Sequence, residues 1–245
     1  QLEQRGDTIA AVIVEPMLQG AGGMIVWPAE FLAGVRRLCD RFGVLLIADE
    51  VLTGFGRTGR MFACEHADIT PDVICLSKAL TAGYLPLGAT AVTTPVYDAF
   101  LSADHSNTFF HGHSFTANPL ACAVALASLD LFESADVMHS VRRIERQLID
   151  GLAPVRTLPA VGDIRVIGAV AAIELRTDAS ARGVGGYLDR LGPHLSKAFL
   201  ERGLLLRPLG NVLYFMPPYV ITPDEVTWCL SQITDVIASL DSPGT

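Results

Sequence analysis

Lysine is nearly absent from this sequence of 245 residues. Only Lys78 and Lys197 occur, and the rest of the 18 lysine and arginine residues are arginines. Arginine replaces lysine well on a surface, but a guanidinium cannot serve as a neutral amine nucleophile. Lys197 lies in HLSKAFLERG, which has the pattern of an ordinary helix face, whereas Lys78 follows the apolar run VICLS and precedes a glycine-containing loop. Lys78 is therefore the candidate for a chemical role.

The sequence also lacks the features of several protein classes. Its formal net charge of −8 repels phosphodiester backbones, so we expect no nucleic-acid partner. None of the five cysteines forms a C-x-x-C pair, which is typical of reduced thiols in a cytoplasmic protein. No signal peptide or apolar run of membrane-spanning length is visible, so we expect no membrane partner. The first residue is not Met, and we expect the chain to be a piece of a longer polypeptide.

The first 135 residues alternate between apolar runs and helical patterns. The predicted strands are residues 9–14, 44–48, 72–77 and 89–94. One helix starts at Pro28 and stops at Gly43, and another starts at Asn118 and Pro119. Strands that are apolar throughout and alternate with helices predict an α/β fold with a mostly parallel sheet. In such a sheet the ligand site lies beyond the carboxyl ends of the strands.

The pattern changes after about residue 135. A charged helix over 140–152 precedes an apolar run at 164–175, IRVIGAVAAIEL, which we interpret as one strand. A helix through LSKAFLERG follows, then short strands around LLLRP and VLYFMPP, and a final helix that starts at a capping box in Thr222–Glu225. We therefore predict two domains, a large domain over 1–135 and a smaller C-terminal α+β domain over 136–245.

Asp49 and Lys78 each stand at the end of a predicted strand, 29 residues apart. Pyridoxal 5′-phosphate needs such a pair, because a lysine amine holds its aldehyde as a Schiff base and a carboxylate keeps its ring nitrogen protonated. Spacing alone leaves open the alternative that both residues are ordinary surface charges.

Three motifs surround these residues: VIVEPMLQGAGGM, LLIADEVLTGFGRTGRMFACEH and PDVICLSKALTAGYLPLGA. They resemble the class III aminotransferases, a branch of fold type I of the pyridoxal-phosphate enzymes, and the resemblance is continuous from residue 9 to about 133. It implies that Lys78 is the imine lysine, that Asp49 pairs with the pyridine nitrogen and that Val51 packs on the ring face.

Two further motifs, FFHGHSFTANPLACAVALASL and LLLRPLGNVLYFMPPYVIT, resemble one branch of that class. This likeness implies transfer of an amino group from S-adenosylmethionine to 8-amino-7-oxononanoate, which gives 7,8-diaminononanoate in biotin biosynthesis. It also implies a homodimer with shared sites, in which Ser114 reaches the neighbouring subunit's cofactor phosphate. Arg207 would bind the substrate carboxylate, with Gly112 and Tyr214 in the substrate site. His113 stands where the family more often has Pro.

Two other functions remain open at this stage. Another class III enzyme could act on an ω-amine such as ornithine or 4-aminobutyrate, and lysine could replace S-adenosylmethionine as the amino donor. A binding fragment without catalysis is the third possibility, because the resemblance places residue 1 well inside the family's chain. The part of the family chain that cups the phosphate would then be missing.

Other polar or glycine-rich positions have simpler interpretations. His111 and His113 alternate like metal ligands, but no third ligand is evident, so we predict no metal site. The glycines in residues 20–23 lack the context of a nucleotide loop and predict a turn. Arg57 and Thr58 are expected to hold the GFGRTG loop rather than to touch substrate.

Overall fold

The computed structural model describes residues 1–177 and 191–240. The chain folds into two compact units. The first unit comprises residues 1–17, 27–55 and 60–136, and the second comprises 18–26, 56–59 and 137–245. Two short segments from the first 136 residues thus belong to the second unit. The division into domains at residue 135 stays a prediction.

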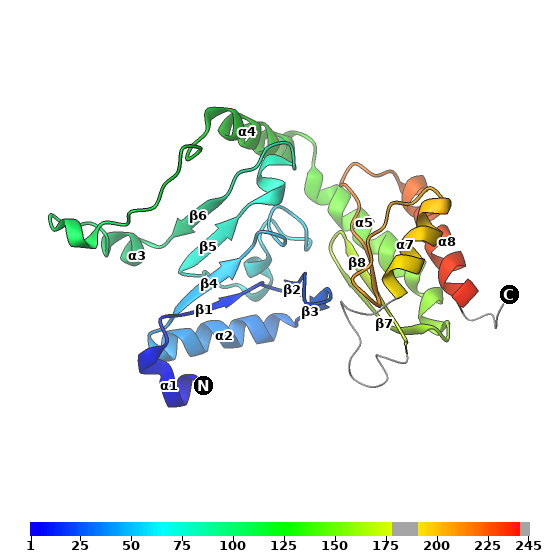
Figure 1. Ribbon diagram of the computed structural model, residues 1–245, viewed down its shortest axis with the longest axis horizontal. Helices are drawn as coiled ribbons and strands as arrows, with labels where there is room; N and C mark the ends of the chain where they lie inside the picture. Colours follow the sequence, from blue (N-terminus) through cyan, green and yellow to red (C-terminus); the bar gives the residue numbers. More distant parts are fainter. Residues whose placement is uncertain (178–190, 241–245) are drawn as a thin grey trace. The chain divides into compact units, whose positions relative to one another are not determined.

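A four-stranded sheet forms the centre of the first unit, in the strand order β1-β4-β5-β6 (Figure 1). The strands are β1 (Ala11–Val14), β4 (Leu45–Asp49), β5 (Val73–Leu76) and β6 (Ala89–Val92). Strands β1, β4 and β5 run parallel, whereas β6 pairs antiparallel with β5. The prediction of a mostly parallel sheet in an α/β fold is confirmed.

Helix α2 (Ala29–Phe42) directly precedes β4, and its ends follow from local chemistry. Pro28 precedes the first helical residue, where its fixed φ and missing N–H are harmless. Gly43 ends the helix with a φ of 64°, and its N–H donates to the carbonyls of Cys39 and Asp40. Leu32 and Cys39 are buried on this helix. The predicted start and stop are confirmed within one residue.

The remaining elements of the first unit are short, apart from one helix. They are α1 (Leu2–Arg5), η1 (Gly6–Thr8), η2 (Ala63–Ala67), η3 (Lys78–Thr81), α3 (Thr94–Asp98), η4 (His105–Asn107) and α4 (Pro119–Ser134). Helix α4 starts where the sequence predicts, because the Asn118 side chain accepts hydrogen bonds from the N–H groups of Leu120 and Ala121. None of the helices within residues 1–177 and 191–240 is long and apolar enough to cross a membrane.

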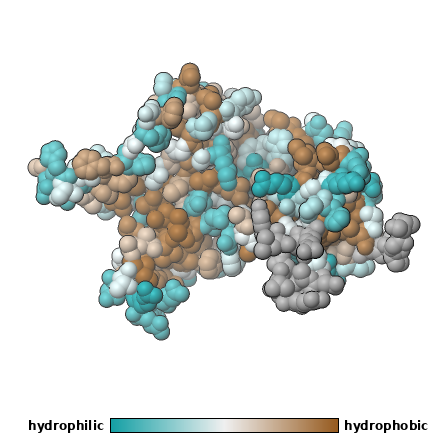
Figure 2. All heavy atoms as spheres, in the orientation of Figure 1, coloured by the Kyte–Doolittle hydropathy of each residue, from teal (hydrophilic) through white to brown (hydrophobic). Residues whose placement is uncertain are grey.

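The sheet of the first unit carries uncovered apolar side chains. Figure 2 shows hydrophobic residues gathered over its strands, on which Ile13 is 64% exposed and Val92 is 42% exposed. Parallel strands usually have both faces covered. An exposed apolar surface of this kind marks a place for further contacts.

The second unit packs helices, among them α5, α7 and α8 (Figure 1), against a three-stranded antiparallel sheet in the order β7-β8-β9. Its strands are β7 (Val161–Ile167), β8 (Val170–Leu175) and β9 (Val212–Phe215), with a separate hairpin of β2 (Leu18–Gln19) and β3 (Ile25–Val26). Its helices are α5 (Val137–Leu152), η5 (Pro154–Thr157), α7 (Leu191–Glu201) and α8 (Pro223–Leu240). Side chains from α5, β8, α7, β9 and α8 form one core, including Leu148, Ile173, Phe199, Leu213 and Ile233.

The interpretation of IRVIGAVAAIEL as one strand is wrong, because these residues form most of the β7–β8 hairpin. Ile167 pairs with Val170, which leaves Gly168 and Ala169 as a two-residue loop. Gly168 has a φ of 52°, a conformation that glycine adopts without steric cost. Strand β8 is central in its sheet and is buried along almost its whole length, so neither polar turn residues nor alternation mark the hairpin in the sequence.

The end of the second unit follows its prediction more closely. Helix α8 begins at a capping box, in which the Thr222 N–H donates to Glu225 Oε2 at 2.8 Å and the Glu225 N–H donates to Thr222 Oγ1 at 3.3 Å. The predicted strand around LLLRP is wrong. Residues 204–208 form no ladder, and only Leu209 makes an isolated bridge, to Val212.

Candidate functional site

Asp49 and Lys78 lie at the same edge of the sheet in the first unit. Asp49 is the last residue of β4, and it pairs with Cys75 of β5. Lys78 follows two residues after β5 ends. Because β4 and β5 run parallel, their carboxyl ends place a carboxylate and an amine at one edge. This is where ligands bind in sheets of this kind.

The Asp49 carboxylate is partly buried and held in place by the backbone that follows it. The Val51 N–H donates to Asp49 Oδ1 at 3.1 Å. The peptide group between Asp49 and Glu50 is also fixed, since the Glu50 N–H donates to the Cys75 carbonyl at 3.0 Å and extends the β4–β5 ladder. Within the described part of the chain no hydrogen bond to Asp49 Oδ2 occurs, so this oxygen can accept a hydrogen bond from a donor group of a ligand.

Lys78 is exposed and its backbone is strained. Its φ of 43° lies in the left-handed region, which costs a non-glycine residue about 1–2 kcal/mol. Such strain persists only where neighbouring contacts enforce it, and it is frequent at functional sites. None of the ion pairs between described residues involves Lys78, whereas Lys197 lies 3.9 Å from Glu201 on the exposed face of α7. Lys197 is thus an ordinary surface lysine, as predicted.

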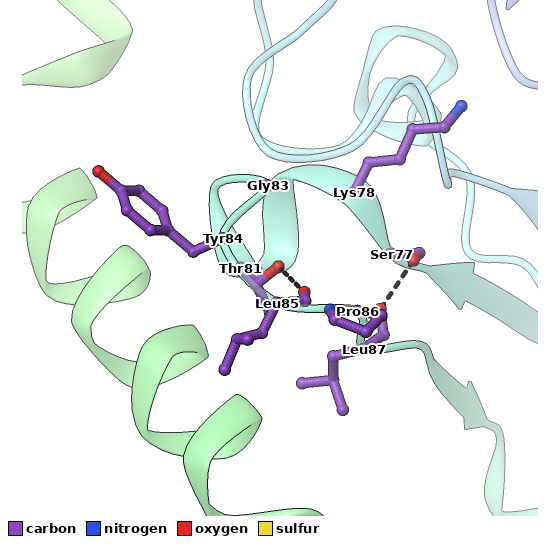
Figure 3. Close-up of a pocket in the computed structure, with 8 residues that line it drawn as sticks. All are labelled: Ser77, Lys78, Thr81, Gly83, Tyr84, Leu85, Pro86 and Leu87. Atoms are coloured by element: carbon purple, nitrogen blue, oxygen red, sulfur yellow. Dashed lines mark hydrogen bonds between the residues drawn. The ribbon is translucent and has the colours of Figure 1, made fainter. Parts of the chain in front are cut away.

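The loop after Lys78 is tied to itself by two hydroxyl groups (Figure 3). Ser77 Oγ donates to the Leu87 carbonyl at 2.7 Å, and Thr81 Oγ1 donates to the Leu85 carbonyl at 2.5 Å. An open hollow of about 350 Å³ is lined by Ser77, Lys78, Thr81 and residues 83–87, and the Lys78 side chain projects from this loop. Asp49 and Val51 do not line the hollow.

The other predicted site residues lie on segments of the chain other than the ends of β4 and β5. Gly112 and Ser114 are exposed in a segment without regular strands or helices, between η4 and α4. Arg207 and Tyr214 belong to the second unit, where Arg207 is exposed and Tyr214 is half-buried in β9 opposite Ala172. Their roles stay predictions.

Two charged residues, buried Glu50 and half-buried Arg57, received no chemical role from the sequence. Glu50 is completely buried beside Asp49. Arg57 Nη1 donates to the Pro217 carbonyl at 3.1 Å, and its guanidinium lies over the Tyr219 ring at 4.5 Å. Burial lowers the pKa of Arg57, against the opposing effect of Tyr219. These contacts attach the loop that carries Arg57 to residues 217 and 219, and the expectation that Arg57 and Thr58 hold the GFGRTG loop rather than touch substrate stays a prediction. Glu50 carries no signal in the sequence beyond its place after a strand.

The glycine-rich segment after β2 forms a turn, as predicted. The N–H groups of Gly23 and Met24 both donate to the Gly20 carbonyl. Arg165 of β7 fixes this turn, because its guanidinium donates to the carbonyls of Gly23 at 3.1 Å and Met24 at 3.0 Å.

Sequence comparison assigns these elements to one family. The model of the family described as aminotransferase class-III matches residues 1–237. The chain belongs to the class-III aminotransferases. The strand-end pair of Asp49 and Lys78 is thus a feature of a class-III aminotransferase chain.

Relatives of this class-III chain are known in sequence and in structure. It is 50% identical over 233 residues to adenosylmethionine-8-amino-7-oxononanoate aminotransferase of Geobacter sulfurreducens, covering 95% of this chain and 51% of that protein. It is 47% identical to the protein of the same name from Nitratidesulfovibrio vulgaris, covering 99% and 45%. The chain therefore spans about half the length of the curated relatives it matches.

Solved structures support the same fold for this class-III chain. The adenosylmethionine-8-amino-7-oxononanoate aminotransferase of Methanocaldococcus jannaschii matches with a TM-score of 0.92 at 36% identity, over 98% of this chain and 56% of that one. The omega transaminase of Pseudomonas jessenii in complex with PMP matches with a TM-score of 0.90 at 33% identity, over 100% and 55%.

Proposed function

We propose that the protein is an adenosylmethionine-8-amino-7-oxononanoate aminotransferase that binds pyridoxal 5′-phosphate through Lys78. The observation that carries the proposal is the 50% and 47% identity to enzymes of that name over nearly the whole chain. The substrates would be 8-amino-7-oxononanoate and S-adenosylmethionine, in biotin biosynthesis. The names of these relatives favour this activity over an ornithine or 4-aminobutyrate aminotransferase.

The residues at the strand ends fit this cofactor. When bound, pyridoxal phosphate supplies an aldehyde for covalent attachment and a conjugated ring that takes up electrons from the substrate. The exposed Nζ of Lys78 is suited to bind the aldehyde carbon. Asp49, with Oδ1 held by the Val51 N–H, is suited to keep a proton on the ring nitrogen. Val51 would pack on the ring face.

Lys78 would also move protons during the reaction. When its Nζ is uncharged and not bonded to the cofactor, Lys78 would be the base that accepts a proton from the donor carbon and the acid that later returns it. Arg207 would bind the carboxylate of the keto substrate with two parallel hydrogen bonds, and Gly112 and Tyr214 would contact the same substrate.

Replacing each lysine by arginine tests the proposal in the full-length gene product. Lys78→Arg keeps the charge but removes the amine nucleophile, so the visible absorption of bound pyridoxal phosphate should disappear. Turnover of 8-amino-7-oxononanoate with S-adenosylmethionine should fall at least about 10²–10⁴-fold, the range of a lost general base. Lys197→Arg, the matched control on α7, should keep both signals. Near wild-type turnover by Lys78→Arg would refute the assignment.

The active unit would be a homodimer in which Ser114 serves the neighbouring subunit's cofactor phosphate. Exposed aromatic side chains flank Ser114, with Phe110 84% exposed and Phe115 72% exposed, which favours burial of this segment by another chain.

Mixing two inactive variants tests this assembly. One carries Lys78→Ala, and the other carries Ser114→Ala with a second disabling change in the same segment. A mixed dimer collects both lesions in one site and leaves the other site intact. Random exchange should therefore restore activity toward about a quarter of wild type. Proven exchange without recovery would remove Ser114 from a shared site.

A further inference from the structure

Glu50 presents a buried carboxylate whose oxygens are all engaged. Its exposed fraction is 0%. Oε2 accepts the hydroxyl of Thr53 at 2.6 Å and the N–H of Ala63 at 2.9 Å. Oε1 accepts the N–H of Cys64 at 2.9 Å. The Cys64 thiol faces the same carboxylate, and its pKa is raised by burial first and by Glu50 second.

Among the residues that the structure describes, no basic side chain pairs with this carboxylate. None of the ion pairs within residues 1–177 and 191–240 involves Glu50. Its partners are instead backbone and hydroxyl donors from residues 53–64. A buried carboxylate requires such donors to offset its lost hydration. Glu50 therefore closes the base of loop 51–62, because it joins the end of β4 to the start of η2.

The closed loop determines where Asp49 points. The two peptide groups that follow Asp49 are both fixed, one by the Cys75 carbonyl and one by Asp49 Oδ1 itself. The Gly54 N–H donates to the Glu50 carbonyl at 2.9 Å, and a Cβ at Gly54 would lie only 2.9 Å from that oxygen. The turn after Asp49 thus has little freedom as long as Glu50 holds its donors.

We propose that Glu50 is a positioning residue for Asp49, acting through the Val51 N–H to orient the carboxylate toward the ring nitrogen of pyridoxal phosphate. This role rests on the proposed function.

A glutamine cannot replace this carboxylate, although it has nearly the same shape. Ionised Glu50 is an acceptor on both oxygens, whereas an amide has one acceptor oxygen and one NH₂ donor. An NH₂ at the Oε1 position would face the Cys64 N–H, and an NH₂ at the Oε2 position would face the Ala63 N–H. Either orientation leaves a buried backbone donor unpaired.

Glu65 provides a matched control in the same segment. Its Oε1 accepts the Phe62 N–H at 2.8 Å, and the residue is exposed. Glu65→Gln can keep that bond through its carbonyl oxygen. Thr53→Val is a milder second variant, because it removes one of three donors and leaves both backbone donors on Glu50.

Two measurements on the full-length gene product test the proposal. The first is amide hydrogen exchange at Ala63, Cys64 and Val51 without cofactor. The second is titration with pyridoxal phosphate, following the visible band of the bound cofactor and its pH midpoint. In Glu50→Gln the three amides should exchange at least about tenfold faster, since each loses its fixed partner or position. Cofactor affinity should fall about 10–100-fold, as when groups that orient a ligating residue are removed, and the pH midpoint should shift.

The outcomes separate this role from simpler ones. Glu65→Gln should match wild type in both measurements, and Thr53→Val should change both in the same direction as Glu50→Gln but less. Faster exchange in Glu50→Gln with an unchanged band, midpoint and affinity would overturn the proposal and leave Glu50 a purely structural residue. If Glu50→Gln does not fold, an unchanged Thr53→Val in both measurements overturns it. Wild-type protein that binds no pyridoxal phosphate would overturn the proposed function together with this role.

Discussion

Gly168 in the β7–β8 hairpin is the position where one added methyl group should most disturb the second unit. A Cβ built there would collide with backbone atoms of Arg57 and Thr58 and would lie 2.5 Å from the Gly59 nitrogen. Backbone atoms cannot rotate away as the end of a side chain can. The Gly168 N–H also donates to Glu145 Oε1 at 2.7 Å, so movement of the hairpin would strain that bond.

Two free-energy costs add at Gly168→Ala. An alanine at a φ of 52° costs about 1–2 kcal/mol, and forcing atoms into a packed site costs about 1–3 kcal/mol. The free energy of unfolding should therefore fall by about 2–5 kcal/mol. Gly203→Ala is the control in the same unit. Gly203 has a φ of 80°, but the nearest atom to its Cβ would be a Trp228 ring carbon at 3.8 Å, so only about 1–2 kcal/mol should be lost.

Urea denaturation followed by tryptophan fluorescence measures this difference. The chain has two tryptophans, Trp27 in the first unit and Trp228 in the second. A Trp27→Phe background would make Trp228 the reporter of the second unit. Equal losses of stability in Gly168→Ala and Gly203→Ala would refute the backbone collision inferred at the hairpin.

Two further changes probe local interactions. Burial alone would raise the pKa of Asp72, but hydrogen bonds from the Leu46 N–H and the Arg36 guanidinium outweigh it and lower the pKa. This carboxylate therefore stabilises the fold above the unfolded-state pKa, and the contribution is lost as the pH falls through the lower folded-state value. Urea midpoints measured from pH 6 down to pH 2 should decline less steeply in Asp72→Asn, and parallel declines would contradict the ion pair. Thr222→Ala removes the cap bond to the Glu225 N–H and should cost about 1 kcal/mol in the same assay, whereas an unchanged midpoint would show that the capping box contributes nothing.

The sequence predicts those parts of the fold that local chemistry controls. Gly43 ends α2 through its backbone conformation and the two hydrogen bonds that its N–H donates. Asn118 starts α4 through hydrogen bonds that its side chain accepts from the first turn of the helix. The β7–β8 hairpin escapes prediction because tertiary burial of β8 replaces the polar residues that normally mark a turn. Gly168 inside the apolar run was the available signal.

The candidate site divides in the same way. Lys78 and Asp49 could be found because each follows an apolar strand, and parallel pairing brings the two strand ends to one edge. The burial of Glu50 could not be found, because its donors at Ala63 and Cys64 are backbone groups that any residue would supply. The left-handed backbone of Lys78 was equally hidden, since lysine rarely adopts it.

The capture of residues 18–26 by the second unit has a consequence for how the chain folds. Arg165 donates hydrogen bonds to carbonyls that lie 141 and 142 residues earlier in the sequence, and Gly168 packs closely against the backbone near residue 58. Contacts of such long separation form slowly, because a large loop must close before they contribute. During synthesis from the N-terminus these early segments must wait for β7 to emerge. A fragment cut at residue 136 would separate Arg165 and Gly168 from their partners, so the second unit needs both its segments before residue 60 and its segments after residue 136.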